Sequence, residues 1–220
     1  MKYVPVLDKG FRPMYAEFKE YSEEAAKTEN KLLKICVERN DGYNYIYEYK
    51  IFTNGHKDEN NLMAERIVKT ILWLVGGYKI YLAGDENVYE FIKAAYTDKG
   101  IRAFDKNFME RVYEKPFEVI MCDEKNFPKE KKCSLSVGGH LDGCRIGFDA
   151  GGSDRKVSAV IDGKVVYSEE VVWFPKINSD PDYHYNEILT ALKTAASKMP
   201  RVDAIGVSSA GVYVNNKIMV

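Results

Sequence analysis

The sequence predicts a mixed α/β protein with two domains. Strand-like and helix-like segments alternate along its 220 residues, and the hydrophobic share of 45% is ordinary for a globular protein. A charged, proline-containing stretch at residues 123–132 separates two parts with different patterns. We therefore expect a small α+β domain over residues 1–132 and a second α/β domain over residues 133–220.

The first domain is expected to contain a hairpin followed by alternating helices and strands. Residues 1–30 are mostly polar, which predicts a surface helix or a partly ordered arm. Asp41 and Gly42 are typical of a hairpin turn. Strands are expected at 35–39, 43–52, 78–83 and 117–122, and helices at about 60–75, 84–96 and 104–113. The first of these helices is expected to bury Leu62, Met63, Ile67, Ile71, Leu72 and Val75.

The second domain is expected to begin with three antiparallel strands. These lie at about 145–150, 156–161 and 164–173, with Asp162 and Gly163 as a two-residue hairpin turn. A helix at about 183–199 and a buried strand at 202–207 follow. The chain then has a small-residue turn at 208–211 and the start of another strand at 212–220.

Composition excludes several classes of protein. The net charge of −1 argues against broad nucleic-acid binding, which needs clustered lysine and arginine. The longest apolar run, residues 71–75, is too short to span a bilayer, and the N-terminus lacks the apolar core of a signal peptide. We therefore expect a cytoplasmic location. Cys133, His140 and Cys144 are more typical of unrelated linker and strand residues than of a metal site.

Two other patterns allow two interpretations each. Alternate tyrosines at positions 43, 45, 47 and 49 indicate half-buried sheet packing or an aromatic interface for a partner. His184, between Tyr183 and Tyr185, fits the start of a helix with exposed rings, or a side chain that faces a ligand.

The strongest candidate for a functional site is the turn after the first strand of the second domain. Asp149 precedes Gly151, Gly152 and Ser153. Glycines allow backbone N–H groups and a hydroxyl to close on a phosphate, and Asp149 is placed to reach a hydrated Mg²⁺ on that phosphate. The alternative is a plain hairpin turn.

Residues 144–220 resemble the actin, Hsp70 and sugar-kinase superfamily of ATPases, and within it the ROK family of sugar kinases and repressors. The resemblance implies the first half of a ribonuclease-H-like domain. The ROK pattern D-x-G-G-T-K matches Asp149, Gly151, Gly152 and Ser153. Asp154 stands where the pattern has lysine, which shifts the cationic role to Arg155 or Lys156.

The resemblance implies an ATP- and magnesium-dependent phosphotransferase. It implies that the nucleotide is bound by Asp149, Gly151, Gly152, Ser153 and Lys156. Asp149 would also bind the metal. A looser match to G-x-G-x-P-G gives Ser208, Ser209 and Gly211 to a sugar or related substrate.

The catalytic base, the adenosine site and the zinc segment of the family are not found before Val220. We therefore expect the chain to be the N-terminal part of a longer protein, inactive alone, with ATP and Mg²⁺ bound only by the complete protein. The alternative is a non-catalytic regulatory or protein-binding module. An open sheet edge would also favour a homo-oligomer.

Overall fold

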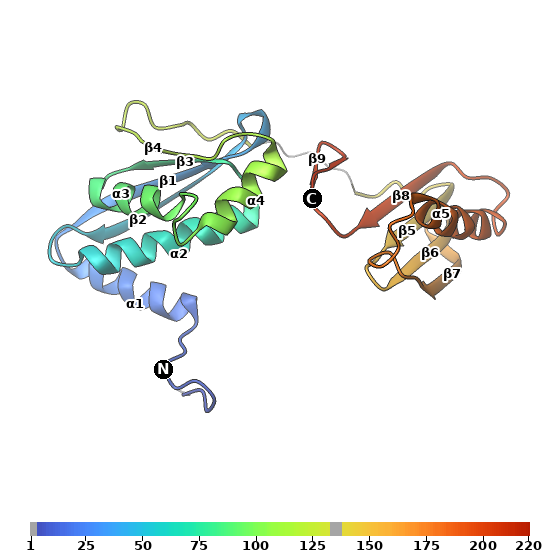
Figure 1. The fold of residues 1–220 in the computed structure, drawn as a ribbon, viewed down its shortest axis with the longest axis horizontal. Helices are drawn as coiled ribbons and strands as arrows, with labels where there is room; N and C mark the ends of the chain where they lie inside the picture. The colour runs from blue at the N-terminus through green and yellow to red at the C-terminus, as the bar shows by residue number, and fades with distance from the viewer. Residues whose placement is uncertain (1–3, 133–137) are drawn as a thin grey trace. The chain divides into compact units, whose positions relative to one another are not determined.

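The computed structural model describes residues 4–132 and 138–220 and confirms the mixed α/β class (Figure 1). Its internal contacts divide the chain into two units. The first unit holds the described residues up to 132 together with Tyr213–Val220, and the second holds those from 138 to Val212. The last eight residues therefore associate with the first unit, whereas the sequence-based division placed them in the second domain. Cys133 lies outside the described residues.

The first unit is built on a four-stranded sheet in the order β2-β1-β3-β4. Strand β1 pairs antiparallel with β2 and β3, and β3 pairs parallel with β4. The strands are β1 (Asn30–Glu38), β2 (Asn44–Phe52), β3 (Lys79–Ala83) and β4 (Glu118–Met121). The helices are α1 (Met14–Lys27), α2 (Lys57–Val75), α3 (Glu86–Ala95) and α4 (Ala103–Tyr113). Alternate residues of β1, such as Leu33 and Ile35, share one core with the buried sides of the helices.

Local sequence explains most boundaries in this unit. Asp41 and Gly42 both have positive φ, at 60° and 71°, as expected for the turn between β1 and β2. Asp85 caps α3 by accepting a hydrogen bond from the backbone N–H of Val88 at 2.8 Å. The buried face of α2 was predicted incorrectly in one respect. Leu62 is 51% exposed, whereas Ala64 is fully buried, because the buried face of the helix passes through Ala64 and not through Leu62.

Helix α1 is more than a polar arm, because its aromatic side contacts β2. Tyr21 is buried, and its ring packs edge-on against Phe52 with the centroids 5.2 Å apart. Phe18 lies 5.7 Å from the ring of Tyr49 in the same way. Sheet packing thus explains the inner tyrosines of the alternating row, and Tyr45 is the exposed member at 37%.

The charged stretch at 123–132, expected to separate the two domains, is fixed to the hairpin. The backbone N–H of Asn44 donates to the carbonyl of Lys131 at 3.0 Å, and the backbone N–H of Lys131 donates to Asn44 Oδ1 at 3.0 Å. The ammonium of Lys131 also donates to the carbonyl of Asp41 at 2.7 Å. These three bonds attach the end of the stretch to the β1–β2 turn.

The second unit is a four-stranded sheet with one helix. The order is β7-β6-β5-β8, in which β5 pairs antiparallel with β6 and parallel with β8. The elements are β5 (Cys144–Ala150), β6 (Asp154–Ile161), β7 (Lys164–Val172), α5 (Pro181–Ala196) and β8 (Ala204–Ser209). The core joins β5, β6 and α5 through Ile146, Phe148, Val157, Ala159, Ala191 and Ala195.

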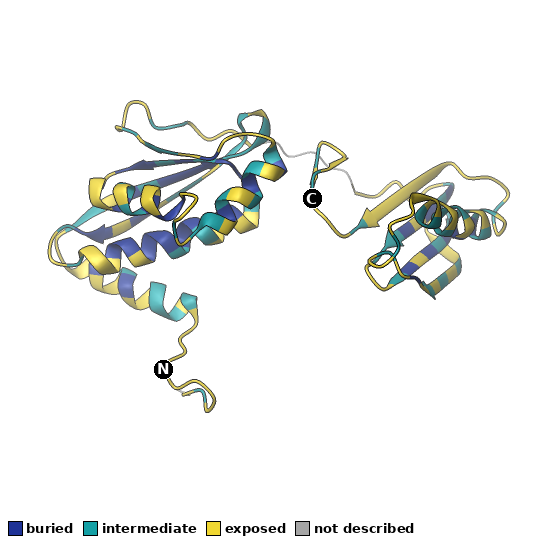
Figure 2. Ribbon diagram, in the orientation of Figure 1, coloured by how far each residue is buried: buried dark blue, intermediate teal, exposed yellow. Residues whose placement is uncertain are grey.

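The expectation that residues 202–207 form a buried strand is wrong. Strand β8 is exposed along almost its whole length (Figure 2), with Ile205 48% and Val207 66% exposed. The physical reason is that α5 packs on β5 and β6, so neither face of β8 is covered by it. The segment after β8 forms only a two-residue pair, β9 (Tyr213–Val214) with β10 (Lys217–Ile218).

Two buried tyrosine hydroxyls in the first unit differ in their hydrogen bonding. The hydroxyl of Tyr21 donates to Asn60 Oδ1 at 2.6 Å, whereas the buried hydroxyl of Tyr49 has no partner within the described residues. We predict that Tyr21→Phe lowers the stability of this unit by about 1–2 kcal/mol. The matched Tyr49→Phe should leave stability unchanged or raise it, because it removes an unpaired buried group. Hydrogen exchange of β1 and α2 amides measures both, and equal losses would contradict this.

Alkaline pH should destabilise the first unit. Burial raises the pKa of Cys36 to about 12 from 9.0, and burial also raises the pKa values of Tyr21 and Tyr49 above 10.0. These groups lose protons more readily when unfolded, so their contribution is complete below about pH 9 and falls as the pH rises further. Urea unfolding, followed by exchange of α2 amides from pH 7 to 11, should show this fall. A constant midpoint across the range would contradict it.

Candidate functional site

The register of β5 brings three predicted site residues into one row across the sheet. Asp149 lies opposite Lys156 on β6 and opposite Ser208 on β8. The hydroxyl of Ser208 donates to Asp149 Oδ1 at 2.6 Å. The parallel strands β5 and β8 both end here, at the edge where ligands gather in α/β proteins.

Lys156 carries a positive charge between two carboxylates. Its ammonium nitrogen lies 2.5 Å from Asp154 Oδ1 and 3.8 Å from Glu170 Oε1. The hydrogen bond that Lys156 donates to Asp154 raises the pKa of Lys156, so the side chain remains protonated. Asp154 thus holds Lys156, two residues further along β6.

The row borders a hollow of about 640 Å³ on the sheet. A second row of small residues, in register across the strands, supplies much of the remaining floor: Ser168, Ser158, Gly147 and Gly206. Because these side chains are small, they leave the space above this part of the sheet open. A volume of this size is typical of small-molecule sites.

The predicted phosphate turn directly follows β5 and is held by Trp173. The indole N–H of Trp173 donates to the carbonyl of Gly151 at 2.7 Å, and its backbone N–H donates to the carbonyl of Ser153 at 3.2 Å. The backbone N–H groups of Gly152 and Ser153 have no hydrogen-bond partner among the described residues. Both residues are exposed, so these donors are accessible to a ligand such as an oxyanion.

Lys176 is a candidate that the sequence reasoning missed. Its ammonium lies 3.3 Å from the position that a Cβ on Gly152 would occupy, so it lies beside the turn. Lys176 lies in the loop after β7, more than twenty residues from Gly152 in the sequence. Nothing in the local sequence indicates that its side chain approaches the turn. The turn therefore has two nearby cations, Lys156 and Lys176.

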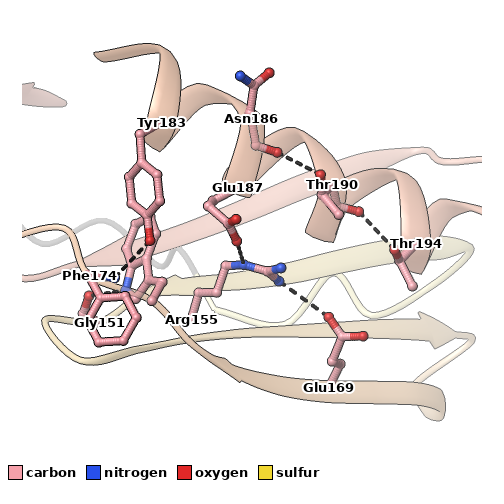
Figure 3. Close-up of polar contacts among 10 residues, drawn as sticks. Gly151, Arg155, Glu169, Phe174, Tyr183, Asn186, Glu187, Thr190 and Thr194 are labelled. Atoms are coloured by element: carbon pink, nitrogen blue, oxygen red, sulfur yellow. Dashed lines mark hydrogen bonds and ion pairs between the residues drawn. The ribbon is translucent and has the colours of Figure 1, made fainter. Parts of the chain in front are cut away.

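Arg155 lies on the other face of the sheet and is unsuited to the phosphate role considered for it. Alternation along β6 turns it away from Lys156 and towards α5. Arg155 is buried, and its guanidinium contacts Glu187 at 2.8 Å and Glu169 at 3.3 Å (Figure 3). This ion-pair group fixes α5 to β6 and β7.

The remaining predicted residues lie away from the hollow. Ser209 pairs with Ala150, and alternation turns it from the side that Ser208 occupies; its hydroxyl bonds the carbonyl of Ala210 at 3.1 Å. Gly211 follows with a φ of 131° and is not part of the lining. His184 lies against Trp173, and its Nε2 is 2.9 Å from the carbonyl of Asn178, so it has a packing role.

The residues present fit only one kind of magnesium site. Within residues 4–132 and 138–220, no group of three or more histidine, cysteine, aspartate or glutamate side chains is placed to hold a metal ion. Asp149 lines the hollow together with Glu169 and Glu170, of which Glu169 is paired with Arg155 and Glu170 lies 3.8 Å from Lys156. Mg²⁺ usually keeps several waters and takes one or two carboxylates plus substrate phosphates. The donor set thus fits a Mg²⁺ ion carried mainly by phosphate and water.

Comparison with known proteins adds no identification: no family model and no curated protein matches the chain. None of the helices in the described part of the chain is long and apolar enough to cross a membrane.

The two glycines of the turn should differ in their tolerance of a side chain. A Cβ on Gly151 would lie 2.5 Å from the backbone carbonyl oxygen of Asp154, whereas one on Gly152 would meet only the end of the Lys176 side chain. We predict that Gly151→Ala destabilises the second unit by about 1–3 kcal/mol and that Gly152→Ala costs less than about 0.5 kcal/mol. Hydrogen exchange of β5 and β6 amides tests this. A larger loss for Gly152→Ala would contradict it.

Proposed function

We propose that the second unit is the phosphate- and magnesium-binding part of a ROK-like, sugar-kinase-like protein with a ribonuclease-H-like arrangement. The observation that carries the proposal is the row of Asp149, Lys156 and Ser208 beside the Gly151–Ser153 turn. The order of three antiparallel strands, a helix and a parallel strand supports the same arrangement.

Each group has a distinct role in this proposal. The free N–H groups of Gly152 and Ser153 donate to phosphate oxygens, and Lys176 and Lys156 supply positive charge. Asp149 would hold the hydrated metal ion, and the Ser208 hydroxyl fixes the orientation of that carboxylate. When bound, Mg²⁺ would neutralise charge on the phosphates.

The exposed strand β8 also supports the proposal. Ile205 and Val207 are apolar and largely exposed, and the outer edge of β8 has no neighbouring strand among the described residues. An apolar strand exposed in this way is suited to contact with a partner surface. Of the three residues that the resemblance gives to the sugar, only Ser208 lines the hollow, so only Ser208 would border a sugar there.

Binding of magnesium pyrophosphate by this chain tests the proposal, because that ligand needs no adenosine site. We expect saturable shifts of the Gly152 and Ser153 amides in NMR spectra, and Mg²⁺ should strengthen binding. Asp149→Asn should abolish the Mg²⁺ effect and weaken binding about tenfold, equivalent to ~1.4 kcal/mol. The matched control Asp142→Asn changes an exposed aspartate that contacts Arg145 outside the row, and should have no effect. Unchanged binding in Asp149→Asn would contradict the role of Asp149.

A second candidate, a non-catalytic regulatory or protein-binding module, is favoured by one observation. Lys156 is held between Asp154 and Glu170, so the cation expected at the phosphate is largely neutralised. Absence of any Mg²⁺-dependent binding, with the β5 and β6 amide spectrum intact, would select this candidate. Recovery of binding in Asp154→Asn would show that the site is weakened by that aspartate alone.

A further inference from the structure

The loop between β2 and α2 contains Asn54 followed by Gly55, and Asn54 is the only asparagine of the sequence that precedes a glycine. Both residues are exposed and lie outside the helices and strands. A Cβ on Gly55 would have no atom within 4 Å, so the space beside this residue is open. Glycine allows a close approach to its backbone nitrogen because it has no side chain to obstruct it.

Few hydrogen bonds restrain this pair. The backbone N–H groups of Asn54 and Gly55 have no partner among the residues that the structure describes. The side chain of Asn54 makes one contact, in which its Nδ2 donates to Glu29 Oε2 at 3.4 Å. A bond of this length between exposed groups is weak. The Asn54 side chain can therefore turn towards the nitrogen of Gly55.

Asn178, which precedes Ser179, provides a comparison within the same chain. It also lies in a loop outside the helices and strands. Its Nδ2 donates to the carbonyl of Phe174 at 2.7 Å, and its own carbonyl lies 2.9 Å from Nε2 of His184. The side chain and the backbone of Asn178 are thus both held, and the residue that follows it has a Cβ.

We propose that Asn54 is a site of spontaneous deamidation. The backbone nitrogen of Gly55 gives its proton to solvent and attacks Cγ of Asn54. A bond forms between this nitrogen and Cγ, the bond from Cγ to Nδ2 breaks, and the side-chain nitrogen takes up a proton and leaves as ammonia. The product is a five-membered succinimide ring, and nothing is oxidised or reduced.

Water then opens the ring at either of its two carbonyl carbons, and the exposed loop gives water access to both. Opening at Cγ leaves aspartate at position 54. Opening at the backbone carbonyl carbon leaves isoaspartate, in which the main chain continues through Cβ and Cγ. Both products carry a new carboxylate beside Glu29 in place of an amide.

The ends of the loop are fixed, so its length affects the packing of α2. Asn60, in the first turn of α2, bonds the backbone N–H and the carbonyl of Phe52 at 3.3 Å and 2.9 Å. The backbone N–H of Thr53 donates to the carbonyl of Glu29 at 3.2 Å. Isoaspartate adds one main-chain atom between Phe52 and Asn60. We therefore infer that isoaspartate, but not aspartate, weakens the buried bonds of Asn60. This site lies in the first unit and does not depend on the proposed nucleotide function.

The test is to incubate the whole folded chain at pH 6 and pH 8 and to follow its peptides by mass spectrometry. The peptide that contains Asn54 should gain one mass unit and separate into two products. The reaction should be faster at pH 8, because the attacking nitrogen must lose its proton. The rate should lie within about tenfold of that of the urea-unfolded chain, because the loop is exposed. The peptide that contains Asn178 should react at least about tenfold more slowly in the folded chain.

Two variants separate the reaction from its surroundings. Asn54→Gln keeps a side-chain amide in the loop but needs a six-membered ring, so the mass gain should be lost. The matched control Asn87→Gln changes another exposed asparagine, which precedes Val88, and should leave the reaction at Asn54 unchanged. No mass gain at Asn54 in the folded chain, or equal rates at Asn54 and Asn178, would overturn the proposal.

Hydrogen exchange measures the effect on the fold. Amides at the start of α2 should exchange faster in the isoaspartate form than in the unmodified chain. The variant Asn54→Asp, which has the new charge but a main chain of normal length, should exchange as the unmodified chain does. Equal exchange in the isoaspartate form and in Asn54→Asp would overturn the inferred effect of loop length.

Discussion

The pairing of β5 with β6 on one side and β8 on the other is the constraint on which the second unit depends. Because β5 is central, its register decides that Asp149 meets Lys156 and Ser208 rather than any other residues of those strands. The same alternation sends Phe148 and Val157 into the core under α5. A slip of one residue would exchange the two faces, so core packing and site geometry are fixed together.

The ion pairs of this unit lie on both faces of its sheet, and they serve different purposes on each face. Arg155 is buried with Glu169 and Glu187 on the helix side of the sheet, and it stabilises the packing of α5. Lys156, one residue later, lies on the opposite, open side, where it is paired with Asp154 and Glu170. In the first unit, both oxygens of Asp85 are engaged, by Lys31 and by the start of α3, whereas the buried Oδ1 of Asn61 has no partner among the described residues.

Local signals allowed much of the fold to be predicted, and long-range packing decided the rest. Asp41-Gly42 and Asp162-Gly163 mark their turns because these positions require positive φ, and the alternation of polar and apolar residues places the strands. The exposure of β8 was missed because an apolar strand pattern does not show whether a partner covers it. Lys176 reaches the glycine turn from a distant loop, which no local pattern indicates. The face of the sheet on which Arg155 lies, by contrast, can be predicted from the alternation of side chains along a strand.

Paramagnetic broadening by Mn²⁺ is the most direct test of the central claim, that Asp149 and the glycine turn together hold a metal–phosphate group. Mn²⁺ would replace Mg²⁺ in the presence of pyrophosphate, and the amides nearest the metal would lose intensity first. The account predicts that this loss is strongest at Asp149, Gly152 and Ser208 and needs pyrophosphate. Broadening centred on other residues, or equal broadening without pyrophosphate, would contradict it.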